Sequence, residues 1–413
     1  PTPLAPPTLP FGVDSGTPAP AHAQAAEGPD LAFLGPAPAA EPHVAPPEDD
    51  ALPGDARVAR ARVPSADVDL AGVRVLVADD DAGAAWYFAD RFRSAGCVVE
   101  EAGDGRAALT RAFATHPEVL LVDILMPGMD GLTFARLLRR DVALRDAAIF
   151  HTSWREDWLA RARDLTPAFT AGLRKDTKTD VLLARTREAL RPRARIAARL
   201  AEGGVVRGRL DGLTAFTLLR LLARHRPDAR VQLRDAAFLY AIDLVGGAPR
   251  RATRTDSAGR TTAGARVLAA ALGACAGRFE VLPRRSGEAE LEGSLDEQLA
   301  GPLAQARNAA LACSGPSLLR VERVRLDEEE VSAYVRSTPL FLAEVVARLA
   351  AGVAPRSLML EGGVAPAIVE DLLLDLAARG ALRGVVEREE LSIPITVGTP
   401  VPSELAFLAG ARG

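Results

Sequence analysis

Residues 120–132 read Leu-Leu-Val-Asp-Ile-Leu-Met-Pro-Gly-Met-Asp-Gly-Leu, and this stretch indicates the fold of its part of the chain. The apolar run that ends at Asp123 is too short for a helix and is typical of a buried strand in a parallel sheet. Pro127 and Gly128 end the strand, and a helical pattern starts at Gly131. Asp123 therefore lies at the carboxyl end of a strand, where open α/β sheets carry their chemistry.

The residues around this stretch alternate between strand-like and helix-like segments. The expected strands are Arg74–Ala78, Cys97–Glu101, Val119–Asp123, Ala148–His151 and Phe169–Arg174. The expected helices are Ala84–Ser94, Arg106–Thr115, Thr133–Arg140, Trp154–Arg163 and Thr179–Leu190. Such alternation predicts a doubly wound, five-stranded parallel sheet with helices on both faces.

Composition narrows the class of protein. The 413 residues exceed what a single core usually holds, so we expect several domains. The net charge of −4 gives no general attraction to nucleic acid or to membranes. The three cysteines have no metal or disulfide spacing, and no apolar stretch is long enough for membrane insertion. We expect a cytoplasmic protein whose first residue, Pro1, follows either a removed Met or a longer chain.

Residues 1–70 are rich in Pro and Ala and have an acidic patch at Glu48–Asp50. Such a segment cannot bury enough apolar surface to offset its conformational entropy, which predicts a disordered linker. A ligand for a proline-recognition domain is the alternative interpretation.

Polar residues follow the strands of the expected sheet. They are Asp79 and Asp80 after the first strand, Asp123 after the third, Thr152 after the fourth and Lys175 after the fifth. Carboxylates brought together repel one another unless a cation joins them, and oxygen ligands suit Mg²⁺. A lysine and a hydroxyl can bind phosphoryl oxygens. A carboxylate nucleophile with these neighbours is typical of a phosphoryl-acceptor site.

These residues resemble the receiver domain of two-component response regulators over residues 71–195. The resemblance rests on residues 75–81 and 121–131, on Thr152 and on Lys175. It implies that Asp123 is the phosphoacceptor and that Asp79, Asp80, Asp123 and the backbone carbonyl of Leu125 bind Mg²⁺. It also implies that Lys175 binds the phosphoryl group and that Thr152 is the switch hydroxyl. The implied donor is a sensor histidine kinase or a phosphotransfer protein.

The same residues also have possible structural roles that involve no phosphoryl chemistry. Residues 79–81 could cap the following helix, because aspartate is favoured there. Lys175 could be a solvated charge at a strand end, and Ser153 could take the role of Thr152. A pseudo-receiver that is never phosphorylated is the corresponding alternative function.

Two positions depart from the receiver pattern. Asp176 follows Lys175 where receivers usually have proline, and Gly172 stands where they usually have an aromatic residue, so the resemblance does not extend to the usual aromatic switch. The positions two beyond Asp123 and Thr152 are Leu125 and Trp154, neither of which can position an attacking water. We therefore expect slow autodephosphorylation.

No histidine lies in a kinase-like setting and no Gly-rich ATP-binding pattern is present. We expect no enzymatic activity beyond self-phosphorylation from a donor and the slow loss of that phosphoryl group.

Residues 203–285 form a second expected unit, a smaller α+β domain. Gly208-Arg209-Leu210, the helix Ala215–Leu222, the strands around 237–245 and residues 277–281 are similar to a PATAN-type domain, which implies a protein-interaction module. Several arginines make this unit locally basic, and they form either a solvated face or a surface that binds an acidic partner. They are Arg220, Arg224, Arg226, Arg230, Arg250 and Arg251.

Residues 316–413 form a helical segment with a winged-helix-like pattern that includes strand-like Ile393–Ile395. A DNA-reading helix would lie at Pro366–Ala378, but that stretch carries Glu370, Asp371 and Asp375. Because phosphate contacts dominate DNA affinity, DNA is disfavoured as a partner. The leading hypothesis is a phosphorylation-controlled adaptor that binds an unidentified downstream protein, and the alternative is a DNA-binding transcription regulator.

Overall fold

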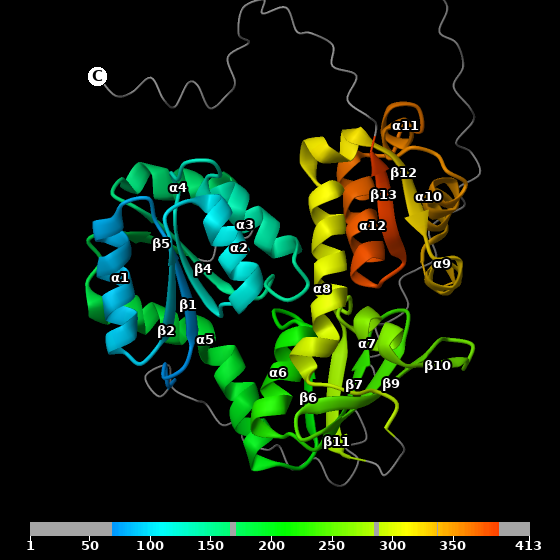
Figure 1. Cartoon of the computed structure of the whole chain (residues 1–413), viewed down its shortest axis with the longest axis horizontal. Helices are drawn as coiled ribbons and strands as arrows, with labels where there is room; N and C mark the ends of the chain where they lie inside the picture. The colour runs from blue at the N-terminus through cyan, green and yellow to red at the C-terminus, as the bar shows by residue number, and fades with distance from the viewer. Residues whose placement is uncertain (1–67, 166–170, 285–288, 337, 388–413) are drawn as a thin grey trace, which may run out of the picture. The chain divides into compact units, whose positions relative to one another are not determined.

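The computed structural model describes residues 68–165, 171–284, 289–336 and 338–387 (Figure 1). The expected linker, except for its last three residues, and the strand-like Ile393–Ile395 lie outside these residues. Among the described helices, none combines the length and the apolar character that a membrane span requires.

The first sheet has five parallel strands in the order β2-β1-β3-β4-β5. The strands are β1 (Arg74–Ala78), β2 (Val98–Ala102), β3 (Val119–Asp123), β4 (Ala148–Ser153) and β5 (Ala171–Arg174). The chain runs from β1 to one edge and then returns through β3 to the other edge, so the strand order reverses between β1 and β3. The predicted doubly wound parallel sheet is confirmed.

Five helices alternate with these strands. They are α1 (Ala82–Ser94), α2 (Gly105–Thr115), α3 (Gly131–Arg140), α4 (Glu156–Leu165) and α5 (Thr179–Glu202). One core contains Phe88 and Phe92 of α1 together with Leu182 of α5. A separate core contains Ala108 of α2 and Phe134 of α3. Helices therefore cover both faces of the sheet.

Helix α5 is longer than its sequence pattern indicated. We expected it to end at Leu190, but it continues through Pro192 to Glu202. A proline inside a helix removes a backbone hydrogen bond and costs about 3 kcal/mol. Leu190 and Leu200 are both buried, and their packing offsets that cost.

The second sheet has six antiparallel strands in the order β10-β9-β8-β7-β11-β6. They are β6 (Val206–Arg209), β7 (Ala229–Arg234), β8 (Leu239–Val245), β9 (Ala248–Thr255), β10 (Thr261–Ala263) and β11 (Arg278–Pro283). Alternate residues of β7, namely Ala229, Val231 and Leu233, are buried against α6 (Ala215–His225) and α7 (Ala265–Ala271). One face of the sheet is therefore covered and the other faces solvent.

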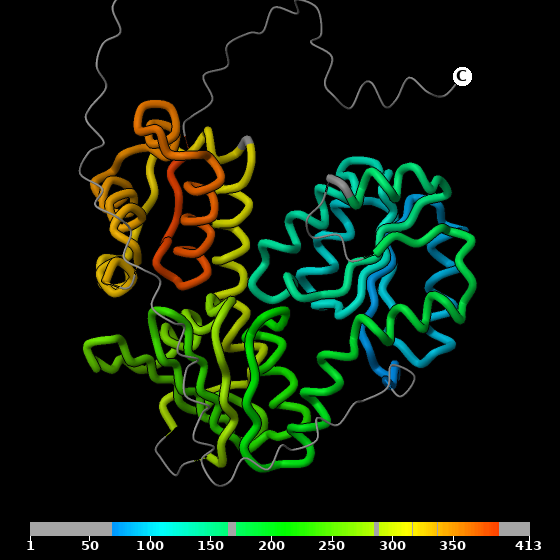
Figure 2. Tube along the Cα trace, turned by 180° about the vertical axis from the view of Figure 1, so that it is seen from behind, coloured from blue at the N-terminus to red at the C-terminus, as the bar shows by residue number. Residues whose placement is uncertain are grey.

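The remaining elements are a two-stranded antiparallel sheet, formed by the last two strands, and the helices that precede and connect these strands. They are α8 (Leu295–Ala312), the 3₁₀ helix η2 (Gly315–Arg320), β12 (Val321–Leu326), α9 (Glu328–Val335), α10 (Leu340–Ala350), α11 (Pro355–Leu360), α12 (Pro366–Ala378) and β13 (Leu382–Glu387). Helices α8 and α12 lie side by side in the trace (Figure 2). Helix α8 was not predicted, although Ser294 and Glu297 form a capping box that is readable in the sequence.

Candidate functional site

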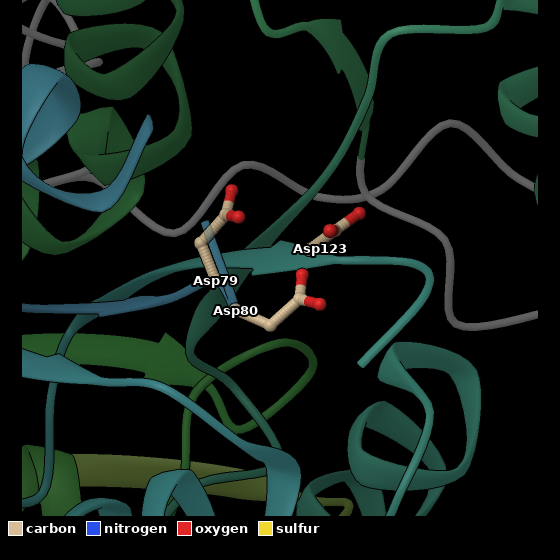
Figure 3. A group of neighbouring side chains, drawn as sticks. All are labelled: Asp79, Asp80 and Asp123. Atoms are coloured by element: carbon tan, nitrogen blue, oxygen red, sulfur yellow. The ribbon is translucent and has the colours of Figure 1, made fainter. Parts of the chain in front are cut away.

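Three carboxylates gather at the carboxyl edge of the first sheet (Figure 3). Asp79 and Asp80 follow β1, and Asp123 is the last residue of β3. Because β1 and β3 are adjacent and parallel, their carboxyl ends lie at the same edge. One oxygen from each carboxylate lies within 4.8 Å of the others. Asp79 and Asp123 are buried, whereas Asp80 is exposed.

Lys175 joins the two buried carboxylates. Its Nζ donates one hydrogen bond of 2.8 Å to Oδ1 of Asp79 and another of 2.8 Å to Oδ2 of Asp123. The lysine follows β5 at the same edge, and only 6% of its surface is exposed. This burial does not fit a solvated charge at a strand end. The cation instead balances part of the negative charge of the carboxylates.

Burial controls the ionisation of this group. It raises the pKa of Asp123 to about 6, although the hydrogen bond and the charge of Lys175 act in the opposite direction. Burial likewise raises the pKa of Asp79, and Lys175 again opposes the shift. For Lys175 itself, burial favours the neutral amine, but the hydrogen bonds to Asp123 and Asp79 raise its pKa overall. One lysine therefore does not fully compensate the two buried carboxylates.

The donor set fits a hard divalent cation. Oδ2 of Asp79 is buried and accepts no hydrogen bond from any residue that the structure describes. An orphaned buried carboxylate oxygen costs free energy that a bound cation would recover. Asp80 offers an exposed carboxylate beside it, through which a hydrated ion such as Mg²⁺ can enter. The N–H of Leu125 donates to Oδ1 of Asp123 at 3.3 Å, and the role predicted for the Leu125 carbonyl stays a prediction.

The helix-capping alternative applies to only one of the three consecutive aspartates. Oδ1 of Asp81 accepts hydrogen bonds from the N–H groups of Gly83 and Ala84, which satisfies the first turn of α1. Asp79 and Asp80 do not serve this cap. Asp81 therefore has the structural role, which leaves its two neighbours at the acidic edge.

Thr152 and Ser153 occupy different surroundings. Thr152 is a direct neighbour of Asp123 across the β3–β4 ladder and is 1% exposed. The hydroxyl of Ser153 accepts a hydrogen bond of 3.2 Å from the N–H of Arg155, which gives it a local role in the turn. This difference favours Thr152 as the hydroxyl that would respond to a phosphoryl group on Asp123.

The departures from the receiver pattern lie around this edge. Leu125 and Trp154 are 50% and 56% exposed, so both positions two beyond Asp123 and Thr152 present apolar side chains to solvent. Asp176 forms a bidentate ion pair with Arg174 through contacts of 2.9 and 3.0 Å. No cis peptide bond occurs among the described residues.

Gly131 is a residue whose importance the sequence did not reveal. A Cβ at this position would lie 2.2 Å from the carbonyl oxygen of Asp123, which no side chain tolerates. The start of α3 therefore packs directly against the backbone of Asp123. Asp130, at the N-cap of α3, accepts hydrogen bonds from the N–H groups of Leu132 and Thr133. A glycine after an N-cap aspartate was the available signal.

The doubly wound sheet and its acidic edge define an α/β domain of the receiver class. Residues 75–187 match the family model of the response regulator receiver domain, and this part of the chain is such a domain. The match ends before the second sheet begins.

Curated relatives are similar over limited parts of the chain. The DNA-binding response regulator MtrA of Mycobacterium tuberculosis is 38% identical over 74 residues, which cover 18% of this chain and 32% of that protein. The transcriptional regulatory protein PrrA of Mycobacterium leprae is 28% identical over 219 residues, which cover 47% of this chain and 93% of that protein. A solved putative response regulator from Chloroflexus aurantiacus is 24% identical, with coverage of 29% and 98% and a TM-score of 0.27. The chain thus spans about a third of the length of the first curated relatives.

Proposed function

We propose that this chain is a response regulator of a two-component phosphorelay, and that Asp123 accepts the phosphoryl group. The observation that carries the proposal is the double hydrogen bond from Nζ of Lys175 to Asp79 and Asp123. These hydrogen bonds place a cation beside Asp123, where phosphorylation would add negative charge. The donor would be a sensor histidine kinase or a phosphotransfer protein, and the setting the cytoplasm.

The chemistry is a single transfer. An oxygen of Asp123 forms a bond to phosphorus while the bond from phosphorus to the donor breaks, and the donor leaves with the bonding electrons. Lys175 stabilises the charge that gathers on the phosphoryl oxygens, and Thr152 can donate its hydroxyl to one of them. Asp79, Asp80 and Asp123 would hold Mg²⁺, which when bound supplies further positive charge to the phosphoryl group. The chain would receive phosphate and not generate it.

The output would proceed through protein contacts of the later elements. The two glycine-containing motifs of residues 203–285 pair in the second sheet, with Phe279 opposite Gly208. A Cβ at Gly208 would lie 2.4 Å from the Phe279 ring, so the motifs depend on each other. This pairing supports the proposal that residues 203–285 are a PATAN-type interaction module.

Incubation with acetyl phosphate and Mg²⁺ tests the acceptor. On a phosphate-affinity gel the wild type should shift, with acetate as the leaving group, and Asp123→Asn should not. Asp90→Asn, a partly exposed aspartate on α1, serves as the control and should shift like the wild type. A folded wild-type chain that does not shift would make the domain a pseudo-receiver.

DNA binding is the second candidate, because the similar MtrA proteins are named DNA-binding response regulators. In this chain α12 buries Val369, Leu373 and Leu376. Its Glu370 is paired with Arg140, and its Asp375 with Arg379. A helix with this charge is a poor reader of DNA. Salt-dependent binding of a DNA duplex by the full chain would favour this candidate over the adaptor.

A further inference from the structure

An arginine row crosses the solvent-facing side of the second sheet. Arg278 of β11 lies directly opposite Arg209 of β6 on one side and Arg234 of β7 on the other. All three residues are exposed. Neighbouring strands are about 4.8 Å apart, so the three Cα atoms span about 10 Å across the sheet. We call Arg209, Arg278 and Arg234 the arginine row.

The arginine row is only partly neutralised. Arg209 forms an ion pair of 2.6 Å with Asp211. Arg234 and Arg278 form no hydrogen bond or ion pair through their side chains with any residue in the described part of the chain. Like charges directly opposite each other on a sheet are destabilising. The two unpaired arginines, which lie side by side, therefore lower the stability of the folded sheet.

Two glycines allow these strands to meet. A Cβ at Gly277 would lie 2.1 Å from the carbonyl oxygen of Arg234, and the φ angle of Gly277 is +131°. Gly277 immediately precedes Arg278, so its close approach brings Arg278 beside Arg234. Gly208, next to Arg209, accommodates the ring of Phe279. The glycines of the two PATAN-like motifs thus set the register that builds the arginine row.

The arginines that the sequence marked as a basic region are a different set. Arg230 forms a bidentate pair with Asp243 at 2.7 Å. Arg220 pairs with Asp296, and Arg251 with Glu290. Much of that region is therefore neutralised internally. Positive charge of this sheet that no described carboxylate neutralises lies at the arginine row instead. The register of the strands brings these arginines together.

We propose that the arginine row binds an acidic segment of a partner protein. Guanidinium groups bind carboxylates in a bidentate geometry, and this favours arginine over lysine at such a surface. Phosphate contacts dominate the affinity of proteins for nucleic acid, and three arginines can neutralise only a few phosphates. The solvent-facing positions of β6, β11 and β7 also carry no aromatic residue on which bases could stack. Charge and size therefore favour a short acidic peptide over nucleic acid.

This inference rests on the proposed adaptor function for the statement that the partner is a protein. Its test uses the full chain without phosphorylation, so it can fail while the phosphorylation of Asp123 succeeds, and the reverse. The probe is a fluorescent hexaglutamate peptide, with hexaglutamine as the uncharged comparison. Fluorescence anisotropy at low salt measures affinity.

Arg278→Glu should weaken hexaglutamate binding at least about fivefold, because it reverses the central charge of the arginine row. Arg278→Lys should weaken binding less than Arg278→Glu does, because lysine keeps the positive charge but loses the bidentate geometry. Arg224→Glu is the matched control: Arg224 is exposed, lies on α6 of the same unit and has no side-chain partner within the described ranges. This control should change affinity less than about twofold.

Three results would overturn the proposal. The first is equal binding of hexaglutamate and hexaglutamine. The second is equal loss of affinity in Arg278→Glu and Arg224→Glu. The third is tighter binding of a single-stranded oligonucleotide or a DNA duplex that Arg278→Glu abolishes, which would assign the arginine row to nucleic acid.

Discussion

Lys175 is the residue on which the electrostatics of the acidic edge depend. It lies between two buried carboxylates and bonds to both. The chain contains one other lysine, Lys178, which is exposed. Two residues of the same type, three positions apart, therefore have opposite environments.

We expect Lys175→Met to lower the free energy of unfolding by about 3 kcal/mol, because it leaves two buried carboxylates without their cation. Lys178→Met should change it by less than about 0.5 kcal/mol. Urea denaturation in metal-free buffer measures both. Similar losses in the two variants would show that Lys175 does not carry this electrostatic role.

Mg²⁺ should stabilise the folded chain through the same carboxylates. A cation that binds only the folded state at ten times its Kd adds about 1.4 kcal/mol. The melting temperature should therefore rise with MgCl₂ and much less with NaCl of equal ionic strength. Asp80→Asn, which alters an exposed residue, should reduce the rise. An equal rise with both salts would argue against a specific site.

The side chains of Leu125 and Trp154 are exposed and apolar, and they bear on the rate of autodephosphorylation. Neither can orient a water for attack on the phosphoryl group, so autodephosphorylation should be slow. Leu125→Asn, which introduces a polar group, should speed the loss severalfold. Gel shift against time after removal of acetyl phosphate measures the rate. Loss within seconds in the wild type would contradict the prediction.

At the scale of elements, the start of α3 fixes the position of Asp123. Gly131→Ala would place a Cβ 2.2 Å from the Asp123 carbonyl oxygen. We expect a loss of about 2 kcal/mol of stability from this overlap and slower phosphorylation, because the backbone of Asp123 must shift. Gly103→Ala is the matched control, since a Cβ there meets no atom within 4 Å. Thermal melts and the phosphate-affinity gel should distinguish the two variants.

Sequence patterns predicted some of the elements well and others poorly. The strand that ends at Asp123 was predicted because a buried parallel strand needs a short apolar run, and all five of its residues are buried. Helix α8 was missed because its pattern is interrupted by Pro302 and its burial depends on distant partners. The predicted end of α5 was wrong for a similar reason. The burial of Leu200 offsets the free-energy cost of placing Pro192 inside the helix.

At the scale of the whole molecule, Arg307 of α8 contacts the receiver domain. Its Nε donates to Oδ2 of Asp141 at 2.6 Å, and its Nη2 lies 2.9 Å from Nε2 of His116. The ring of His116 also lies 4.8 Å from that of Phe216 in α6. Residues from three parts of the sequence therefore meet at His116.

His116 should make stability sensitive to pH. Burial, reinforced by Arg307, lowers its pKa to about 3, whereas an unfolded chain has a value of about 6.5. Below pH 6.5 the unfolded chain binds a proton that the folded chain does not, so the free energy of unfolding falls as the pH decreases toward 3. His116→Asn, which tolerates the positive φ of this position, should weaken that dependence.

Urea denaturation at pH 7.5 and pH 5.5 measures this effect. The difference between the two pH values should be smaller in His116→Asn than in the wild type. His225→Asn serves as the control because His225 is less buried, and it should leave most of the difference in place. An unchanged difference in His116→Asn would contradict the prediction.

Local pattern was sufficient for the receiver sheet and for the acidic residues at its edge, because short apolar runs set the strands and parallel strand ends converge. It could not show that Lys175 bridges Asp79 and Asp123, since a hydrogen bond between residues 96 positions apart depends on the packed sheet. Nor could it show the arginine row, because the register of three antiparallel strands brings Arg209, Arg278 and Arg234 together. Long-range register and burial decide which charges pair and which stay free.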